Sequence, residues 1–394
     1  MTTDTPAPSQ ATQKAQHAAT RRTPVWWIRW LVAWAGRLLL AAVAMALVAA
    51  EAFTDHHHWS QWLFWAPREA YLLATIVLAC LTIFLEPAGP RRFWARLGPF
   101  ALACLVLFHT IFIHWRWHNA VRPRPGNTEL RVYHWNATEA TDEALQDFLR
   151  SSDPFALRRG SPACIVIVNP PLRLDWPDIV RMLAADDIPM DRMPDHLRRG
   201  GRFIVLSGPV ISQSGWTSLE LRGITTDPGI IDDGAAVYIT VDPGLGPTTI
   251  WGIDWPSDPH RTRAGFVGPS LQAIDDSAHV RYHPTAAGPL RREVSTGFPR
   301  PDIALGDFNT GRRSAAVSAL LPGMIDVHDR VGVGPDYTWP RFMRLHGKDT
   351  VLTPFLSLDQ AWVRPGTWRA RAYRTHDLGA GTHLAQEIEL TPDR

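Results

Sequence analysis

The chain has 394 residues, of which 45% are hydrophobic and 20% charged, and its formal net charge is +2. This composition excludes a disordered chain and a small disulfide-stapled module, because it offers enough apolar material for a large core. The charge is unevenly divided: residues 1–126 hold 12 Lys and Arg against 5 Asp and Glu, whereas residues 127–394 hold 28 against 33. We therefore expect a basic, apolar N-terminal part and a mildly acidic globular domain.

Three apolar runs predict membrane-spanning helices in the N-terminal part. They are Leu38–Ala50, which extends back to Trp30, then Ala70–Leu85 and Leu97–Ile113. Strictly counted, the runs are short for a spanning helix of roughly 17–25 residues, but flanking Trp and Arg side chains can sit at headgroup depth and lengthen them. The expected organisation is a tail (1–25), a membrane domain (26–117), a linker (118–127) and a C-terminal domain (128–394).

Basic residues set the expected orientation of these helices. The tail and the loop around residues 86–96 are rich in Lys and Arg, whereas the loop at 51–69 has one Arg and three acidic residues. By the positive-inside rule, we expect the tail and the second loop in the cytoplasm and the C-terminal domain outside it. If the first run is instead a cleaved signal peptide, the C-terminal domain stays on the same side.

Hydrophobic patterning predicts a strand-rich C-terminal domain. Runs rich in β-branched and aromatic residues predict strands at 130–135, 164–168, 203–207, 235–241, 248–253, 303–305, 361–363 and 386–390. Helices are predicted at 142–149, 178–184 and 314–320. The run Cys164–Val168 is wholly apolar, which is typical of a strand buried on both faces. We expect an α+β fold in which a β-sandwich is covered by helices.

The most informative string is Gly306-Asp307-Phe308-Asn309, which follows the short apolar strand at 303–305. Asp307 and Asn309 are two positions apart, so their side chains would share one face of an extended strand. A carboxylate beside a carboxamide suits the positioning of a water and a phosphate oxygen near a divalent cation. The same residue types also favour an ordinary turn.

Further polar residues follow in a definite order. Trp135-Asn136 ends the first predicted strand, and Gly381-Thr382-His383 comes 24 residues after Asp359. A carboxylate that accepts the ring N–H of a histidine raises its basicity and selects its tautomer. Asp359 and His383 are therefore expected to act together.

In this order the strings resemble the endonuclease/exonuclease/phosphatase superfamily, the DNase I-like fold of metal-dependent phosphoesterases, over approximately residues 128–392. They look most similar to its bacterial members with membrane helices ahead of the domain. The resemblance implies a four-layered α/β sandwich that hydrolyses a phosphate mono- or diester with Mg²⁺ or Mn²⁺. It also implies a multi-pass protein of the bacterial inner membrane with an extracytoplasmic C-terminal domain.

The resemblance assigns a role to each matching residue. Asp307 would orient or deprotonate the attacking water, and Asn309 would hold a phosphate oxygen. Asn136 would contact phosphate or a metal-linked water. His383 would stabilise the pentacovalent state or act as an acid, with Asp359 fixing its orientation.

The chain departs from the family at the metal site. Asn169 follows the strand at 164–168, where the family has a metal-binding Glu, and Thr382 replaces the Asp of a closing Ser-Asp-His. Gln360 stands where family members commonly have a His after the Asp that corresponds to Asp359. Asp254 stands at the end of the strand before the Gly-Asp-Phe-Asn strand, where many members have a His. A neutral amide cannot supply a carboxylate's charge to Mg²⁺. The metal ligands expected are Asp307, Asn136 and Asp254; Asp175 and Asp377 are other candidates to compensate, and His283 is an alternative match for the missing His.

Two functions remain open: an extracytoplasmic, membrane-tethered phosphoesterase, and a catalytically degenerate relative that serves as a binding or scaffold domain. The excess of acidic residues in 127–394 is a poor match to duplex DNA, whose binding relies on basic surface. We therefore expect a small or lipid-borne phosphoester rather than nucleic acid as the substrate, and the lipid bilayer as a partner. Arg312 and Arg313, directly after the Asn309 string, are expected to clamp a phosphate.

Overall fold

The computed structural model describes residues 24–86, 92–124, 126–152, 161–171, 193–221, 233–258, 260–285, 288–345 and 348–393. The chain divides into two compact units: Met1–Val48 with Arg68–Thr110, and Ala49–Pro67 with Ile111–Arg394. These boundaries differ from those expected from the sequence, since residues 49–67 and the stretch after 110 belong with the C-terminal domain. The helix expected at 178–184 lies outside the described residues.

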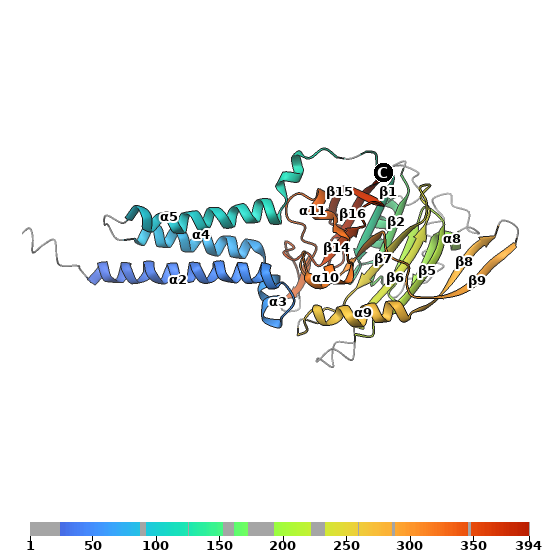
Figure 1. Cartoon of the computed structure of the whole chain (residues 1–394), viewed down its shortest axis with the longest axis horizontal. Helices are drawn as coiled ribbons and strands as arrows, with labels where there is room; N and C mark the ends of the chain where they lie inside the picture. The colour runs from blue at the N-terminus through green and yellow to red at the C-terminus, as the bar shows by residue number, and fades with distance from the viewer. Residues whose placement is uncertain are drawn as a thin grey trace, which may run out of the picture. The chain divides into compact units, whose positions relative to one another are not determined.

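The first unit consists of long apolar helices (Figure 1). They are α2 (Pro24–Phe53), whose last turns belong to the second unit, α4 (Arg68–Leu85) and α5 (Arg92–Phe108), which continues as the π-helix η1 (His109–His114). Among the described residues, three segments are long and apolar enough to cross a membrane: Pro24–Phe53, Arg68–Leu85 and Phe93–His114. Each contains one predicted run. The flanking Trp and Arg residues continue the helices, as expected.

The second unit contains two large mixed sheets, and many of their strands are labelled in Figure 1. In spatial order, the six-stranded sheet contains β15 (Trp368–His376), β16 (Ala385–Pro392), β1 (Leu130–Asn136), β2 (Ala163–Val168), β4 (Phe203–Ser207) and β3 (Leu197–Gly200). The eight-stranded sheet contains β11 (Ile325–Asp326), β14 (Asp359–Val363), β10 (Ile303–Asp307), β7 (Thr248–Asp254), β6 (Ala235–Val241), β5 (Ile211–Ser218), β8 (Ala278–Thr285) and β9 (Gly288–Thr296). Among the described strands, β1 pairs with β2 and β7 with β10 in parallel, and the other neighbours are antiparallel.

Shorter elements complete the second unit. They are α3 (His58–Trp65), η2 (Trp117–Val121), α6 (Asp142–Ser152), α8 (Met193–His196), α9 (Ala264–Asp276), α10 (Ala315–Leu320), α11 (Val327–Val331) and a separate hairpin of β12 (Phe342–Leu345) and β13 (Lys348–Val351).

Side chains on each strand point alternately to the two faces of its sheet, and those on the inner faces form the main core. Side chains such as Val166 in β2 and Ile303 in β10 enter one hydrophobic cluster between the two sheets. The alternate positions face outward, where α6 covers the six-stranded sheet through Leu145 and Phe148. Helices α9 and α10 cover the eight-stranded sheet in the same way. The predicted four-layered α/β sandwich, helix–sheet–sheet–helix, is thus confirmed.

The connecting segment Ala49–Pro67 is part of this unit because its polar side chains bond to the sandwich. The Asp55 carboxylate is fully buried and accepts hydrogen bonds from the N–H groups of Ala315 (3.1 Å) and Ala316 (3.3 Å), at the start of α10. The Gln61 amide oxygen accepts from the backbone N–H of Arg263 at 3.0 Å. A stretch that the sequence indicated only as a loop between spans therefore caps a helix of the C-terminal domain.

Candidate active site

The polar residues of the site lie where strands of both sheets end. Asp307 is the last residue of β10, and it stands in register with Asp254 at the end of parallel β7 and with Asp359 at the start of antiparallel β14. From the other sheet, Asn136 ends β1, and His383 lies two residues before β16. The topology therefore brings residues from five distant strings to one edge of the sandwich.

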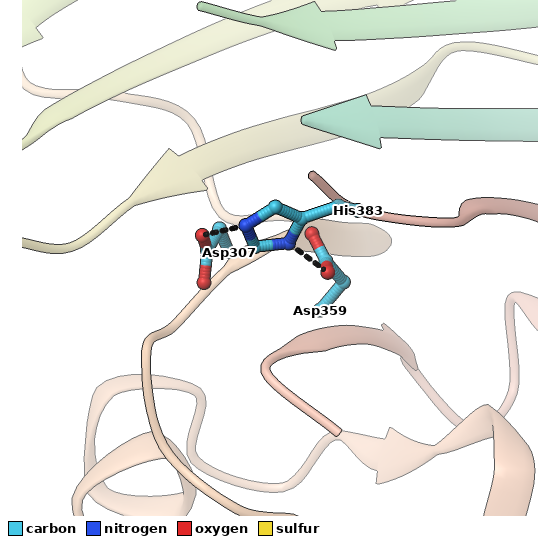
Figure 2. Close-up of side chains that lie close together, drawn as sticks. All are labelled: Asp307, Asp359 and His383. Atoms are coloured by element: carbon cyan, nitrogen blue, oxygen red, sulfur yellow. Dashed lines mark hydrogen bonds and ion pairs between the residues drawn. The ribbon is translucent and has the colours of Figure 1, made fainter. Parts of the chain in front are cut away.

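His383 lies between two carboxylates (Figure 2). Its Nδ1 is 2.8 Å from Oδ2 of Asp359, and its Nε2 is 3.8 Å from Oδ2 of Asp307. All three side chains are buried: the exposed fraction is 7% for His383, 0% for Asp359 and 2% for Asp307. Asp359 thus fixes the imidazole so that Nε2 is directed towards Asp307, without a direct hydrogen bond between them.

The electrostatics separate the protonation states of these groups. Burial and then the Asp359 charge raise the pKa of Asp307 to about 6. Burial alone would lower the pKa of His383, but the charge and hydrogen bond of Asp359 outweigh it, so that this pKa rises to about 9. The pKa of Asp359 is lowered, since His383 outweighs the effect of burial. At neutral pH the site holds a weakly basic carboxylate facing an imidazolium.

A second histidine, His134, lies behind this pair and was missed by the sequence analysis. It is fully buried in β1, with Nδ1 3.5 Å from Oδ1 of Asp359, and burial lowers its pKa to about 4, so it is neutral. The signal was available: His134 and Asn136 are two apart in β1 and share its inner face with the core residue Val132. A polar residue at such a position is a candidate for a site.

Amide groups occupy both oxygens of Asp307. Asn136 donates from Nδ2 to Oδ2 at 2.8 Å, and the backbone N–H of Asn309 donates to Oδ1 at 2.9 Å. The amide oxygen of Asn136 in turn accepts from the backbone N–H of Thr138 (3.2 Å) and from Nδ2 of Asn169 (3.2 Å). Because the Thr138 N–H can only donate, it fixes the orientation of the Asn136 amide, which presents N–H to the site.

Arg263 is a further charged residue that the sequence analysis did not identify. Its Nε donates to the carbonyl of Asn309 at 2.8 Å, and its guanidinium lies 5.0 Å from the Trp65 ring centre and 5.1 Å from that of Phe266. The side chain is almost fully buried, and burial lowers its pKa to about 10. Arg263 therefore holds the Asn309 turn, where the backbone φ is +47°, against the connecting segment.

A cleft of about 1140 Å³ opens over these groups. Its polar wall includes Asn136, Asn169, Arg202, Asp307, Asn309 and His383. Its apolar wall includes Trp62, Trp65, Pro170, Trp339, Leu356 and Leu358. A charged centre beside an aromatic wall suits a phosphoester with an apolar group attached.

The remaining predicted residues lie away from the reactive centre or are already engaged. Asp254 lines the cleft but forms an ion pair with Nη1 of Arg202 at 2.8 Å. Arg312, expected to clamp a phosphate, is instead buried outside the cleft, where Nη1 donates to both oxygens of Asp326 at 2.7 and 2.9 Å. Asp377 pairs with Arg341. The structure does not describe Asp175 or the side chain of His283.

Among the described residues, three buried side chains of the site could supply ligands to the expected divalent cation. Asp307, Asp359 and His383 offer ligand atoms within 4.8 Å of one another, as a metal site requires. However, Oδ2 of Asp359 and Nδ1 of His383 bind each other, and both oxygens of Asp307 accept N–H groups. Mg²⁺ and Mn²⁺ are commonly held by one or two carboxylates together with waters and substrate oxygens, and a carboxylate oxygen that accepts one N–H keeps a second lone pair. Among the described residues, Asp307 could therefore hold such an ion, which would supply positive charge to a phosphate oxygen; Asp254 is held by Arg202, and Asn136 presents N–H.

Comparisons with known proteins give structural neighbours only. No family model matches the chain, and no curated protein does. Similar structures include a mannosyl-6-phosphatase of Bacteroides thetaiotaomicron (11% identity, TM-score 0.40, covering 66% of this chain and 99% of that one) and an endonuclease/exonuclease/phosphatase of Bacteroides vulgatus (12%, 0.41, 68% and 100%). TDP2 of D. rerio, complexed with a single-strand DNA product, is another (15%, 0.40, 66% and 98%). These identities and scores are too low to assign an activity or a substrate to this chain.

Proposed function

We propose that the second unit is a phosphoester hydrolase whose reactive groups are Asp307 and His383. The observation that carries this proposal is the buried pair itself: a carboxylate with a pKa of about 6 faces an imidazole with a pKa of about 9 across 3.8 Å, in the wall of a cleft. Because the two pKa values differ in this way, at neutral pH the Asp307 carboxylate can act as the base while the His383 imidazolium supplies the positive charge.

The proposed reaction is a direct attack of water on phosphorus. Asp307 accepts a proton from the water as its oxygen bonds to phosphorus, and the ester oxygen leaves with the electrons of the broken P–O bond and takes a proton from solvent in the open cleft. His383 donates its Nε2–H to a non-bridging oxygen and so stabilises the charge that develops there. Asp359 keeps the imidazole protonated and oriented.

The substrate proposed is a small or lipid-borne phosphoester, with the lipid-borne form favoured by the cleft. Trp62 and Trp65 of its apolar wall belong to the connecting segment Ala49–Pro67, which lies in the chain between two candidate membrane spans. Aromatic residues at such positions commonly sit at the membrane–water interface. An ester with an acyl chain therefore has an apolar surface to contact beside the reacting centre.

The division of the chain supports the proposed topology. The connecting segment precedes, and residues 111–394 follow, the two later candidate spans, yet both belong to one compact unit. Two crossings return a chain to the side from which it started, so three spans satisfy this arrangement. The basic residues at 91–96 then favour an extracytoplasmic domain on a multi-pass protein of the bacterial inner membrane.

The test is hydrolysis by the full chain in detergent. Bis(p-nitrophenyl) phosphate serves as a soluble diester and a phosphatidic acid micelle as a lipid-borne monoester. We expect Asp307→Asn and His383→Gln each to lower kcat/KM by about 10²–10⁴-fold, while the surface variant Arg150→Gln keeps it. Equal, unaffected rates in all variants would exclude the proposal, and no hydrolysis by the unaltered chain would favour a binding domain instead.

A further inference from the structure

A groove rich in arginine lies in the second unit and shares no lining residue with the cleft of the candidate active site. Its volume is about 440 Å³. Its walls include β15 and β11, which are edge strands of the two sheets, together with the end of α11 and residues that follow η2. The groove is therefore a second cavity of the domain, at the edges of both sheets.

Positive charge dominates the lining of this groove. The charged lining residues are five arginines and one aspartate: Arg122, Arg124, Arg330, Arg369, Arg371 and Asp393. Two of the arginines are paired, since Arg369 forms an ion pair with Asp393 and Arg371 forms one with Glu389 at 2.7 Å. The remaining arginines decide what the groove can bind.

Three guanidinium groups at the groove have no hydrogen-bond or ion-pair partner among the described residues. They belong to Arg122, Arg124 and Arg330, and all three side chains are exposed. This excess of positive charge is local, because residues 127–394 as a whole hold 28 Lys and Arg against 33 Asp and Glu. Planar guanidinium groups bind phosphate oxygens through paired N–H donors, so the groove has the chemistry of a phosphate site.

The segment that carries Arg122 is fixed to the sandwich. Arg116 binds Asp329 of α11 through two contacts, from Nε to Oδ1 at 2.9 Å and from Nη2 to Oδ2 at 2.7 Å. Asn119, which is buried in η2, donates from Nδ2 to the carbonyl of Gly332 at 2.9 Å. The stretch that the sequence indicated as a linker thus holds Arg122 at the groove.

Exposed apolar side chains lie beside these arginines. Val121 is 86% exposed, more than any other large hydrophobic residue that the structure describes, and Trp117 of the same helix is 52% exposed. Val333, which is 45% exposed, lines the groove itself. Basic residues next to Trp and aliphatic side chains are typical of protein surfaces that lie in a membrane–water interface.

The groove is also near a candidate membrane span along the chain. His114 ends the third span, and Arg122 follows eight residues later. Even a fully extended chain covers less than about 30 Å over this length. Because η2 occupies five of these residues and rises only about 2 Å per residue, the actual separation is smaller. Lipid headgroups around the end of that span are therefore within reach.

We propose that this groove binds the headgroup of an anionic phospholipid of the membrane that the chain crosses. Arg122, Arg124 and Arg330 contact the headgroup phosphate, while Val121 and Trp117 contact the adjoining apolar part of the lipid. The bound lipid holds the second unit at the bilayer surface. This proposal depends on the membrane spans but not on the proposed hydrolysis, because the groove is separate from the reactive cleft.

Thermal unfolding of the full chain in dodecyl maltoside micelles tests the site. Dioleoyl phosphatidylglycerol is expected to raise the Tm, whereas the zwitterionic dioleoyl phosphatidylcholine is not. The rise should be largely lost in Arg122→Gln/Arg330→Gln. It should persist in Arg150→Gln/Arg261→Gln, which removes the same charge at residues outside the groove. An undiminished rise in the groove variant overturns the proposal, as does an equal loss in both variants.

A titration of phosphatidylglycerol into the micelles measures the size of the effect. Each arginine near an anionic lipid surface strengthens binding about fivefold, so the groove variant should raise the apparent Kd by about 25-fold. Arg122→Lys/Arg330→Lys keeps both charges and guards against a folding defect, and it should raise the Kd by less than about fivefold. A change of less than threefold in the Gln variant contradicts the proposed site.

Two further arms identify the ligand and the place where it binds. Inorganic phosphate at the same concentration should not reproduce the rise in Tm, and equal stabilisation by phosphate would overturn the assignment to a lipid. The variant His383→Gln, altered in the reactive cleft, should bind phosphatidylglycerol with an unchanged Kd. Loss of binding in that variant would place the lipid in the cleft and overturn the groove site, whereas absence of hydrolysis alone would leave the groove result unaffected.

Discussion

Replacing Asp307 by Asn should make the protein more stable while it strongly lowers the rate of hydrolysis. The carboxylate is 2% exposed, and burial with the neighbouring Asp359 raises its pKa from 3.8 to about 6. A raised pKa means that folding disfavours the charged form, so that Asp307 costs stability wherever it is ionised. An amide of the same shape removes this cost.

The size and sign of the effect follow from the pKa. A shift of about 2 units corresponds to about 3 kcal/mol, which is complete above pH 6 and absent below the ordinary pKa of 3.8. Asn cannot accept both of the N–H groups that the carboxylate accepts, from Asn136 and Asn309, and one lost hydrogen bond costs about 1 kcal/mol. The net gain at pH 8 is therefore about 2 kcal/mol. At pH 5 the electrostatic cost is roughly halved while the lost hydrogen bond is unchanged, so the net gain should fall to about 0.6 kcal/mol.

Differential scanning fluorimetry of the full chain at both pH values measures this gain. Asp302→Asn is the matched control, because Asp302 directly precedes β10 and also accepts a backbone N–H, from Thr249 at 2.9 Å. The control should show no gain. A loss of stability in Asp307→Asn at pH 8, or a gain that does not depend on pH, would refute the assignment of Asp307 as a strained functional carboxylate.

Three further outcomes are expected. The kcat/KM for hydrolysis should rise as Asp307 loses its proton near pH 6 and fall as His383 loses its proton near pH 9; a profile without the lower flank would show that another group is the base. Asp55→Ala should lower the free energy of unfolding by about 3–5 kcal/mol in thermal or denaturant unfolding, because two backbone N–H groups and three hydroxyls lose their acceptor, whereas His56→Ala at the exposed neighbour should be neutral. Gly306→Ala should destabilise the fold by about 3 kcal/mol or more, since its Cβ would lie 1.9 Å from a carbonyl oxygen of β7; a shift in Tm under 2 °C would contradict this.

The sequence predicted the central strands well, because burial on both faces leaves a clear pattern. All six residues of β2 are buried, as the uninterrupted apolar run indicated. β15 was missed, although Trp368, Ala370 and Ala372 alternate inward along it. Arg residues at the intervening positions made that stretch look polar throughout, and small inward residues gave little hydrophobic signal.

Residues of the candidate site could be predicted only where neighbouring residues in the sequence form a recognisable motif. The short sequences around Asp307 and His383 could be recognised by their residue types and their order along the chain. The strand topology then brings the two side chains together. Arg202 and Arg263 carry no such signal, since an arginine in a loop usually points to solvent. Contacts such as that between Arg263 and Gln61, 202 positions apart, depend on the three-dimensional fold.

The bond between Asp55 and the start of α10 joins residues 260 positions apart. During synthesis, Asp55 leaves the ribosome long before its hydrogen-bond donors exist, so the sandwich can be completed only after the stretch up to Ala316 has been made. A chimera that keeps residues 111–394 and exchanges everything before them for another protein's anchor would discard Asp55 and Gln61. Such a swap would remove a helix cap and the aromatic side chains Trp62 and Trp65 of the cleft from the second unit. This N-terminal region is therefore a component of the folded domain and not an exchangeable anchor.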